Sequence, residues 1–149
     1  MKAKKNNGFS LIELLIVVAI ILIIASIAIP NLIRARRSAN ESSATASMRT
    51  IASGELLYRS THGAFGALGL LSADSIVDDV LASGSKSGYA FAATPDATSP
   101  DLQFTTEGTP QISTGALQSG TRFYFADDSQ VVRFNLGGAA TSGSSGIGN

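Results

Sequence analysis

A long, uninterrupted apolar stretch near the N-terminus constrains this chain more than any other feature. From residue 14 to residue 29 every residue except Ser26 is Leu, Ile, Val or Ala, and Glu13 is the only ionisable residue between positions 7 and 33. With a rise of about 1.5 Å per residue, a helix over residues 9–33 is long enough to cross a hydrocarbon core of about 30 Å. The sequence therefore predicts one membrane-spanning helix.

Basic residues flank this apolar stretch on both sides. They are Lys2, Lys4 and Lys5 before it, and Arg34, Arg36 and Arg37 after it. Because three stand on each side, the positive-inside rule does not determine the orientation of the helix. The arginines could contact lipid phosphates or acidic neighbours in an assembly, but an interfacial flank is the ordinary interpretation.

A cleaved secretory signal peptide is the first alternative for this N-terminus. The small residues Ser26 and Ala28 would suit a cleavage site, but the apolar stretch is longer than the usual core of a signal peptide. Cleavage after Ala28 would also place Pro30 second in the mature chain, which is a poor start. Glu13 is the larger objection, because a carboxylate in hydrocarbon costs about 2.5–3.5 kcal/mol. We expect another group to neutralise it.

Residues 8–20, GFSLIELLIVVAI, carry a specific resemblance. A short basic leader ends in Gly8, the aromatic Phe9 follows, Glu13 stands at the fifth position after the glycine, and an apolar helix with Pro30 comes next. This order resembles the leader junction of the type IV pilins and of the type II secretion pseudopilins. The resemblance implies that a membrane aspartyl peptidase, the prepilin peptidase, cleaves between Gly8 and Phe9 and methylates the new amine of Phe9, and that the apolar helix is retained.

Glu13 acquires a candidate partner through this processing. Cleavage removes three lysines and exposes an ammonium group at Phe9. In a packed array of helices, the Glu13 carboxylate can pair with the amine of a neighbouring copy, which would neutralise both charges and fix the axial register. The alternative is a Glu13 that is protonated or that reaches the membrane interface. We favour pairing, because the resemblance places Glu at this position.

The helix is expected to continue beyond the membrane. Pro30 removes a backbone donor and crowds the preceding turn, which predicts a kink there and not a stop. Helical composition resumes to about residue 61, where His62 and Gly63 form a stop signal with Gly63 as the left-handed cap. A stripe of side chains in this part is expected to cover a sheet: Ala44, Met48, Ala52 and Leu56 at i+4 spacing, with Ile51 and Tyr58 beside them.

The remainder of the chain predicts a connecting region and a small antiparallel sheet. One short amphipathic helix is expected after the sequence Ser-Ala-Asp at 72–74. Alternating patterns predict about four strands within 88–135, and the clearest hairpin pairs 121–126 with 130–135 across a tight turn. The last residues, 137–149, are rich in Gly and Ser and predict a flexible tail.

The residues contain no pattern for catalysis. The chain has no Cys, one histidine, His62, and a formal net charge of zero, so it offers no thiolate site, no multi-histidine metal site and no basic footprint for nucleic acid. Pseudopilins often have a calcium-binding loop, for which Asp101, Asp127 and Asp128 are the available carboxylates. Adjacent aspartates in a hairpin turn are more often turn formers, so we predict no metal site. The strand aromatics are expected to form the sheet core.

These observations predict an α+β, pilin-like fold without a cofactor or enzymatic activity. Residues 1–8 are expected to be a leader peptide, 9–33 a transmembrane and assembly helix, 34–136 a periplasmic head and 137–149 a tail. The precursor would span the inner membrane once. Its expected partners are other copies of itself, prepilin peptidase, the assembly platform with its ATPase, and the membrane, with no nucleic acid required.

The favoured function is that of a structural subunit of a type IV pilus on the cell surface. A pseudopilin of a type II secretion system, which assembles in the periplasm, shares every N-terminal feature and remains an alternative. A second alternative is a secreted or membrane-tethered binding domain whose leader resembles a pilin by chance. Retention of the apolar helix after processing, measured by intact mass, would separate this last class from the other two.

Overall fold

The structure of this chain, a computed structural model, describes residues 9–148. The expected leader 1–8, including Gly8, lies outside the described residues. The chain divides into two compact units, Met1–Ala35 and Arg36–Asn149, which we call the stem and the head.

Helix α1, Leu11–His62, begins in the stem and provides the first element of the head. It continues through Pro30 without interruption. At its C-terminus the Gly63 N–H donates to the Arg59 carbonyl oxygen across 2.8 Å, and Gly63 has a φ of +77°. This left-handed conformation is accessible to glycine without a steric cost, so α1 ends where the sequence places a stop signal.

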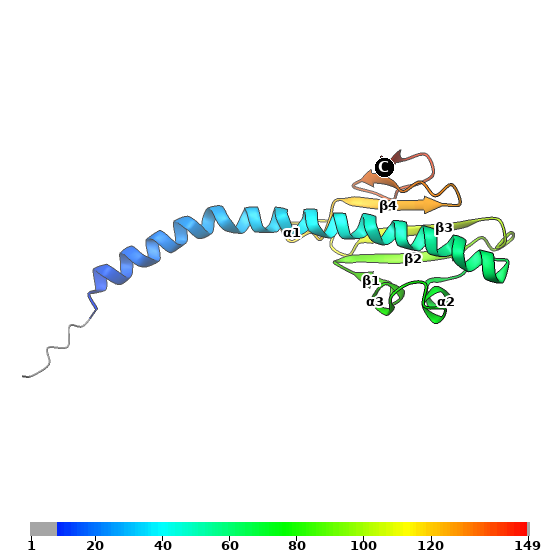
Figure 1. Cartoon of the computed structure of the whole chain (residues 1–149). Coiled ribbons are helices and arrows are strands. Elements are labelled where there is room, and N and C mark those ends of the chain that lie inside the picture. Colours follow the sequence, from blue (N-terminus) through cyan, green and yellow to red (C-terminus); the bar gives the residue numbers. More distant parts are fainter. Residues whose placement is uncertain (1–8, 149) are drawn as a thin grey trace, which may run out of the picture. The chain divides into compact units, whose positions relative to one another are not determined.

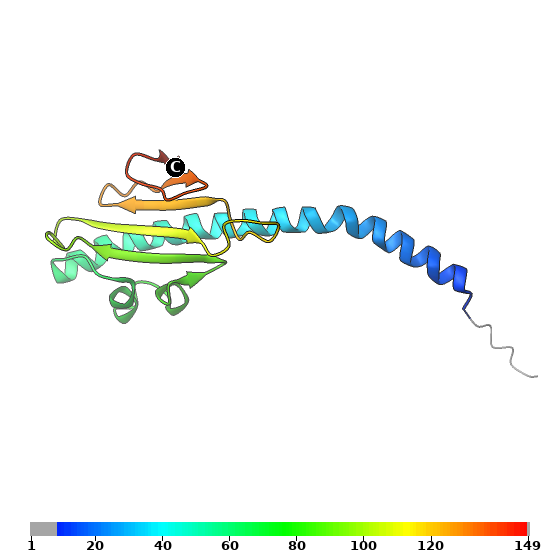
Figure 2. The same ribbon diagram turned by 180° about the vertical axis from the view of Figure 1, so that it is seen from behind.

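The head contains a six-stranded antiparallel sheet with strands in sequential order (Figures 1 and 2). Its strands are β1 (Ser85–Lys86), β2 (Tyr89–Pro95), β3 (Phe104–Pro110), β4 (Arg122–Asp127), β5 (Arg133–Leu136) and β6 (Ser145–Gly146). The α+β fold class is therefore confirmed, but the expected number of about four strands was wrong. The two additional strands, β1 and β6, are two-residue edge strands, which are too short to show an alternating pattern in the sequence.

The head portion of α1 packs across one face of this sheet, so that helix and sheet form two layers (Figures 1 and 2). Apolar side chains from both layers form the core, which includes Ala44, Met48, Ile51, Ala52, Tyr89, Phe91, Phe104 and Tyr124. Along β4 only alternate residues are buried, so Phe123 and Phe125 belong to the opposite face and are half-buried. The expectation that all strand aromatics form the core was wrong for these two.

The buried stripe of α1 also differs from the expected one. Leu56 is 43% exposed, whereas Glu55 is fully buried. At 3.6 residues per turn, three successive i+4 steps from Ala44 rotate the side chain by about 120°, while residue 55 is rotated by only about 20°. The packed face therefore passes through position 55 and not through position 56.

Two short helices replace the single helix expected between α1 and the sheet. They are α2 (Leu68–Ala73) and α3 (Asp79–Ala82). Ser75 has a φ of +57°, which interrupts helical conformation between them. A new cap follows, since the Asp78 carboxylate accepts a hydrogen bond from the Leu81 N–H across 2.8 Å.

The C-terminal segment that the sequence predicted to be a flexible tail contributes β6 to the sheet. The Ile147 N–H donates to the Val132 carbonyl oxygen across 2.7 Å, and the Ile147 side chain packs against the core. Ala140 is buried as well. Backbone pairing needs no apolar side chains, so a Gly- and Ser-rich composition did not reveal it.

Candidate functional site: the exposed apolar helix

The stem helix presents its apolar side chains outward along its whole described length. Every large apolar side chain from Phe9 to Leu32 is 46–81% exposed within this chain. The helix is long and apolar enough to cross a membrane, and no residue of its most apolar segment is buried. An apolar surface of this extent is not stable in water, so lipid or other helices must cover it.

Glu13 lies in the first turn of this helix, three residues after Ser10. Its Oε2 accepts a hydrogen bond from the Ser10 backbone N–H across 2.9 Å. This is half of a capping box, in which the third residue of a helix bonds back to the N-cap. One carboxylate oxygen thus has a local partner, and an ionised carboxylate retains further acceptor sites for another group. The pattern Ser-x-x-Glu was visible in the sequence, but the capping role was missed.

Phe9 and Pro30 stand on either side of the most apolar part of the stem. Phe9 precedes α1 and is 78% exposed. Pro30 lies inside α1 and cannot donate a backbone hydrogen bond, which leaves the Ser26 carbonyl oxygen without its usual helical donor. The predicted kink at this position stays a prediction.

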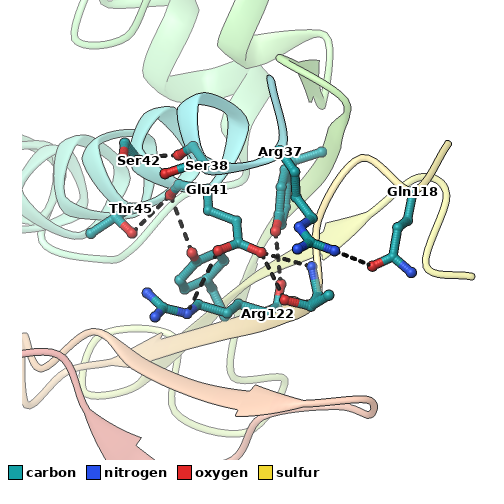
Figure 3. A network of polar contacts seen from close by, with 10 residues as sticks. Arg37, Ser38, Glu41, Ser42, Thr45, Gln118 and Arg122 are labelled. Atoms are coloured by element: carbon teal, nitrogen blue, oxygen red, sulfur yellow. Dashed lines mark hydrogen bonds and ion pairs between the residues drawn. The ribbon is translucent and has the colours of Figure 1, made fainter. Parts of the chain in front are cut away.

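A polar network around Glu41 joins α1 to the sheet at the end of the head where α1 enters (Figure 3). Glu41 Oε1 accepts hydrogen bonds from the backbone N–H and the hydroxyl of Thr121, across 2.8 and 2.9 Å. Glu41 Oε2 lies 3.7 Å from Arg122 Nε. The Tyr124 hydroxyl donates to the Glu41 carbonyl oxygen across 3.1 Å, and burial raises the pKa of Tyr124. One residue of α1 therefore holds both the start and the middle of β4.

Two neighbours extend this network to the loop that precedes β4. Arg37 donates from its guanidinium to Gln118 Oε1 across 3.0 Å, as Figure 3 shows. Asn40 donates to the Ser119 carbonyl oxygen across 3.0 Å. These partners are about 80 residues apart in the sequence, so no local pattern could predict them. Sequence reasoning missed the network, including Glu41.

Comparison with known proteins identifies the family of this chain. Residues 3–29 match the prokaryotic N-terminal methylation motif. The chain is 38% identical over 111 residues to the type IV wide pilus major component PilA4 of Thermus thermophilus, covering 62% of this chain and 85% of that protein. It is 30% identical over 141 residues to the type IV major pilin protein PilA of Myxococcus xanthus, covering 91% of this chain and 62% of that protein.

This chain belongs to the type IV pilin family. The pilin family consists of structural proteins, and this pilin has two units, an apolar stem helix and a folded head. The matched motif spans the positions of Gly8, Phe9 and Glu13.

Two further candidate residues of this pilin, Asp127 and His62, make local contacts in the structure. Asp127 accepts hydrogen bonds from the backbone and hydroxyl of Ser129 in the turn between β4 and β5. Within residues 9–148, no three His, Cys, Asp or Glu residues are grouped so that they could hold a metal ion. His62 stacks on Tyr58 at 4.1 Å between ring centroids and lies 3.5 Å from Asp74.

Glu55 is the second acidic residue that sequence reasoning missed. It is fully buried on α1, and its Oε2 accepts a hydrogen bond from the Gly66 N–H across 3.0 Å. Burial raises the pKa of this carboxyl to about 7, against the opposing effect of that hydrogen bond. Only its position on the packed face of the helix could have revealed it.

Proposed function

We propose that this pilin is a structural subunit of a type IV pilus, processed after Gly8 and polymerised through its apolar stem helix. The observation that carries the proposal is the exposure of every large apolar side chain from Phe9 to Leu32 within the single chain. The head forms its own core, so these side chains are not needed to fold it. They remain available for lipid in the precursor and for other copies in a filament.

The relatives support this assignment over a general membrane anchor. The Thermus protein is a wide pilus major component, and the Myxococcus protein is a major pilin. The methylation motif supports cleavage between Gly8 and Phe9 and methylation of the Phe9 amine. The partners proposed for these steps are the prepilin peptidase, an assembly platform and its ATPase.

Assembly needs a group that sets the register of the helices. Transfer of an apolar helix from lipid to a bundle of apolar helices is nearly neutral, because lipid tails are as apolar as leucine. Specific polar pairing therefore decides how the copies align. Glu13 of one copy can pair with the Phe9 amine of a neighbour, since its hydrogen bond to Ser10 leaves acceptor sites open.

The location of the protein follows from the same model of assembly. The precursor spans the inner membrane once through the stem, with the head in the periplasm. After processing, the copies leave the membrane and become part of a filament that extends from the cell surface. The membrane-spanning length of α1 supports the first of these locations.

Electron microscopy of cells with and without this chain tests the proposal. Surface filaments that disappear on deletion and return with the full-length gene are the expected result. Intact mass of sheared filaments should then give a chain that begins at methylated Phe9. Filaments confined to the periplasm would instead favour the pseudopilin alternative. A mature chain that lacks the stem helix would contradict both.

A further inference from the structure

Two groups of charged residues lie at opposite ends of the head, arginines at one end and aspartates at the other. At the stem end, α1 residues 36–41 lie against the loop 111–121, as the bonds from Asn40 to Ser119 and from Thr121 to Glu41 require. At the distal end, α1 stops, and the Phe65 N–H donates to the Pro100 carbonyl oxygen across 2.8 Å. The distal end therefore includes the loop 96–103.

The register of the sheet places the turn after β4 at the same distal end. Pro95 pairs with Phe104, and Thr105 pairs with Asp127, so the ends of β2 and β4 and the start of β3 lie together. Asp96, Asp127 and Asp128 line one hollow there. Asp101 lies next to Pro100 in the adjoining loop. The distal end thus presents four carboxylates.

In the described part of the head, Arg59 and Arg133 form no ion pair with these carboxylates. Arg59 lies over the Phe65 ring at 5.1 Å, and Arg133 donates to the Ser144 carbonyl oxygen across 3.3 Å. Asp101 and Asp128 are exposed and form no ion pair within residues 9–148.

The stem end has the opposite character. Arg36 and Arg37 are adjacent on α1, and Arg37 bonds to the neutral side chain of Gln118. Arg36 is exposed and likewise has no ion pair in the described structure. Glu41, the nearest carboxylate along α1 in the described head, is committed to Thr121 and Arg122. The charges of Arg36 and Arg37 are therefore not compensated by an ion pair within the described head.

We propose that the stem end of one head, through Arg36, docks against the distal end of another copy, through Asp101 and Asp128. This inference rests on the proposed function, because copies polymerised through the stem helix all point the same way. Opposite ends of parallel copies can meet, and such a head-to-tail contact generates an open helical filament. Complementary charge selects this contact over contacts between like ends.

The two docking ends are separated by the length of the head. From Arg36 to His62 the helix rises about 39 Å. The contact uses only head residues, so it adds a connection between copies that the stem contacts do not provide.

Cysteine cross-linking in the full chain tests this contact. The chain has no cysteine, so Arg36→Cys combined with Asp128→Cys introduces two thiols per copy. A short bis-maleimide added to sheared filaments should give a ladder of covalent multimers with this pair and none with either single variant. Arg49→Cys with Asp128→Cys is the matched control, because Arg49 lies midway along the head portion of α1 and should give no ladder.

A charge exchange provides a second readout that needs no cross-linker. Arg36→Glu should lower the yield of sheared filaments about threefold or more, and adding Asp101→Arg and Asp128→Arg should restore it. Arg49→Glu should leave the yield unchanged. Filaments of the chain with Arg36→Cys and Asp128→Cys that give no ladder, or equal yields from Arg36→Glu and Arg49→Glu, would overturn the docking contact and leave the proposed function intact. A wild-type chain that forms no filaments would overturn the proposed function itself.

Discussion

The Glu55 carboxylate of α1 accepts a hydrogen bond from the backbone N–H of Gly66, across 3.0 Å in the buried interior of the head. Its second oxygen, Oε1, is buried without a hydrogen-bond partner in the described structure. Gly66 is tightly enclosed, because a Cβ there would lie 2.9 Å from a Tyr58 ring carbon. The bond therefore ties the segment that follows α1 to the last turns of the helix. Because Glu55 is buried, its protonated form is favoured over the ionised form.

We expect the soluble fragment from Arg34 onward to fold alone. The core of the head is formed by α1 residues from Ala44 onward together with the sheet and α2, so the stem contributes no core residue. Circular dichroism should show both helix and strand signals and a cooperative melt. A fragment without strand signal or without a melting transition would contradict an independently folded head.

Glu55 should make the stability of this fragment depend on pH. The pKa rises from 4.5 to about 7 on folding, so the unfolded chain loses its proton at lower pH than the folded head does. Stability from this group is fully present below pH 4.5, falls as the pH rises, and levels off above pH 7. The total loss is about 3 kcal/mol.

The variant Glu55→Gln isolates this contribution. Glutamine keeps an oxygen for the Gly66 N–H but does not ionise. Other carboxylates are common to both proteins. The unfolding free energy of wild type minus that of Glu55→Gln should therefore fall by about 3 kcal/mol from acidic to neutral pH. Urea titrations at several pH values measure it. A difference that is constant with pH would show that Glu55 titrates normally.

Gly120 should not tolerate any side chain. A Cβ at this position would lie 1.9 Å from the Tyr89 hydroxyl oxygen, and Tyr89 is fully buried with its hydroxyl donating to the Arg122 carbonyl oxygen. Gly120→Ala therefore forces a shift of buried groups, which we expect to cost about 1–3 kcal/mol. Gly138→Ala is the matched control, since a Cβ there meets nothing within 4 Å. Equal melting temperatures for the two variants would contradict the packing around Tyr89.

Cleavage should depend on the small size of residue 8. The methylation motif spans this position, and a β-branched residue would crowd the peptidase cleft next to the scissile bond. We expect Gly8→Val to accumulate as an uncut precursor in the membrane fraction. Intact mass and N-terminal sequencing decide the outcome, and normal processing of the variant would place the cleavage site elsewhere.

The sequence predicted those features that depend on local composition. Helix α1, its stop at Gly63 and the pairing of β4 with β5 each have a signal within a few residues. The strands β1 and β6 have none, because two residues cannot show alternation and their pairing uses only backbone groups. Glu55 was missed because an acidic residue on a helix is expected to face water, and only the rotation of the helix places it inside.

The candidate functional residues likewise divide into those that have a local sequence signal and those that have none. The motif from Gly8 to Glu13 is contiguous, so its resemblance to pilins could be recognised without a structure. The Glu41 network could not, because its bonds to Thr121 and Arg122 depend on how α1 lies across the sheet. The grouping of Asp96, Asp127 and Asp128 at one end of the head likewise depends on which loops share an end of the sheet.

Glu13 should be more important for assembly than for membrane insertion. In Glu13→Ala, insertion of the stem should improve by up to about 3 kcal/mol, because a carboxylate no longer enters hydrocarbon. In the filament, the Phe9 amine of a neighbour would be buried without its carboxylate, which costs about 3–5 kcal/mol. We therefore expect normal or raised membrane abundance together with a loss of sheared filaments, measured side by side with wild type.

The hydrogen bond from the Ser10 N–H requires a control, because Glu13→Ala also removes this cap. Loss of a helix cap costs about 1 kcal/mol, and glutamine at the same position can accept the same bond. Glu13→Gln thus keeps the cap and removes the charge. If pairing with the amine sets the register, both variants should lose filaments to a similar extent. If Glu13→Gln assembles normally while Glu13→Ala does not, Glu13 acts through the cap, and another group must align the copies.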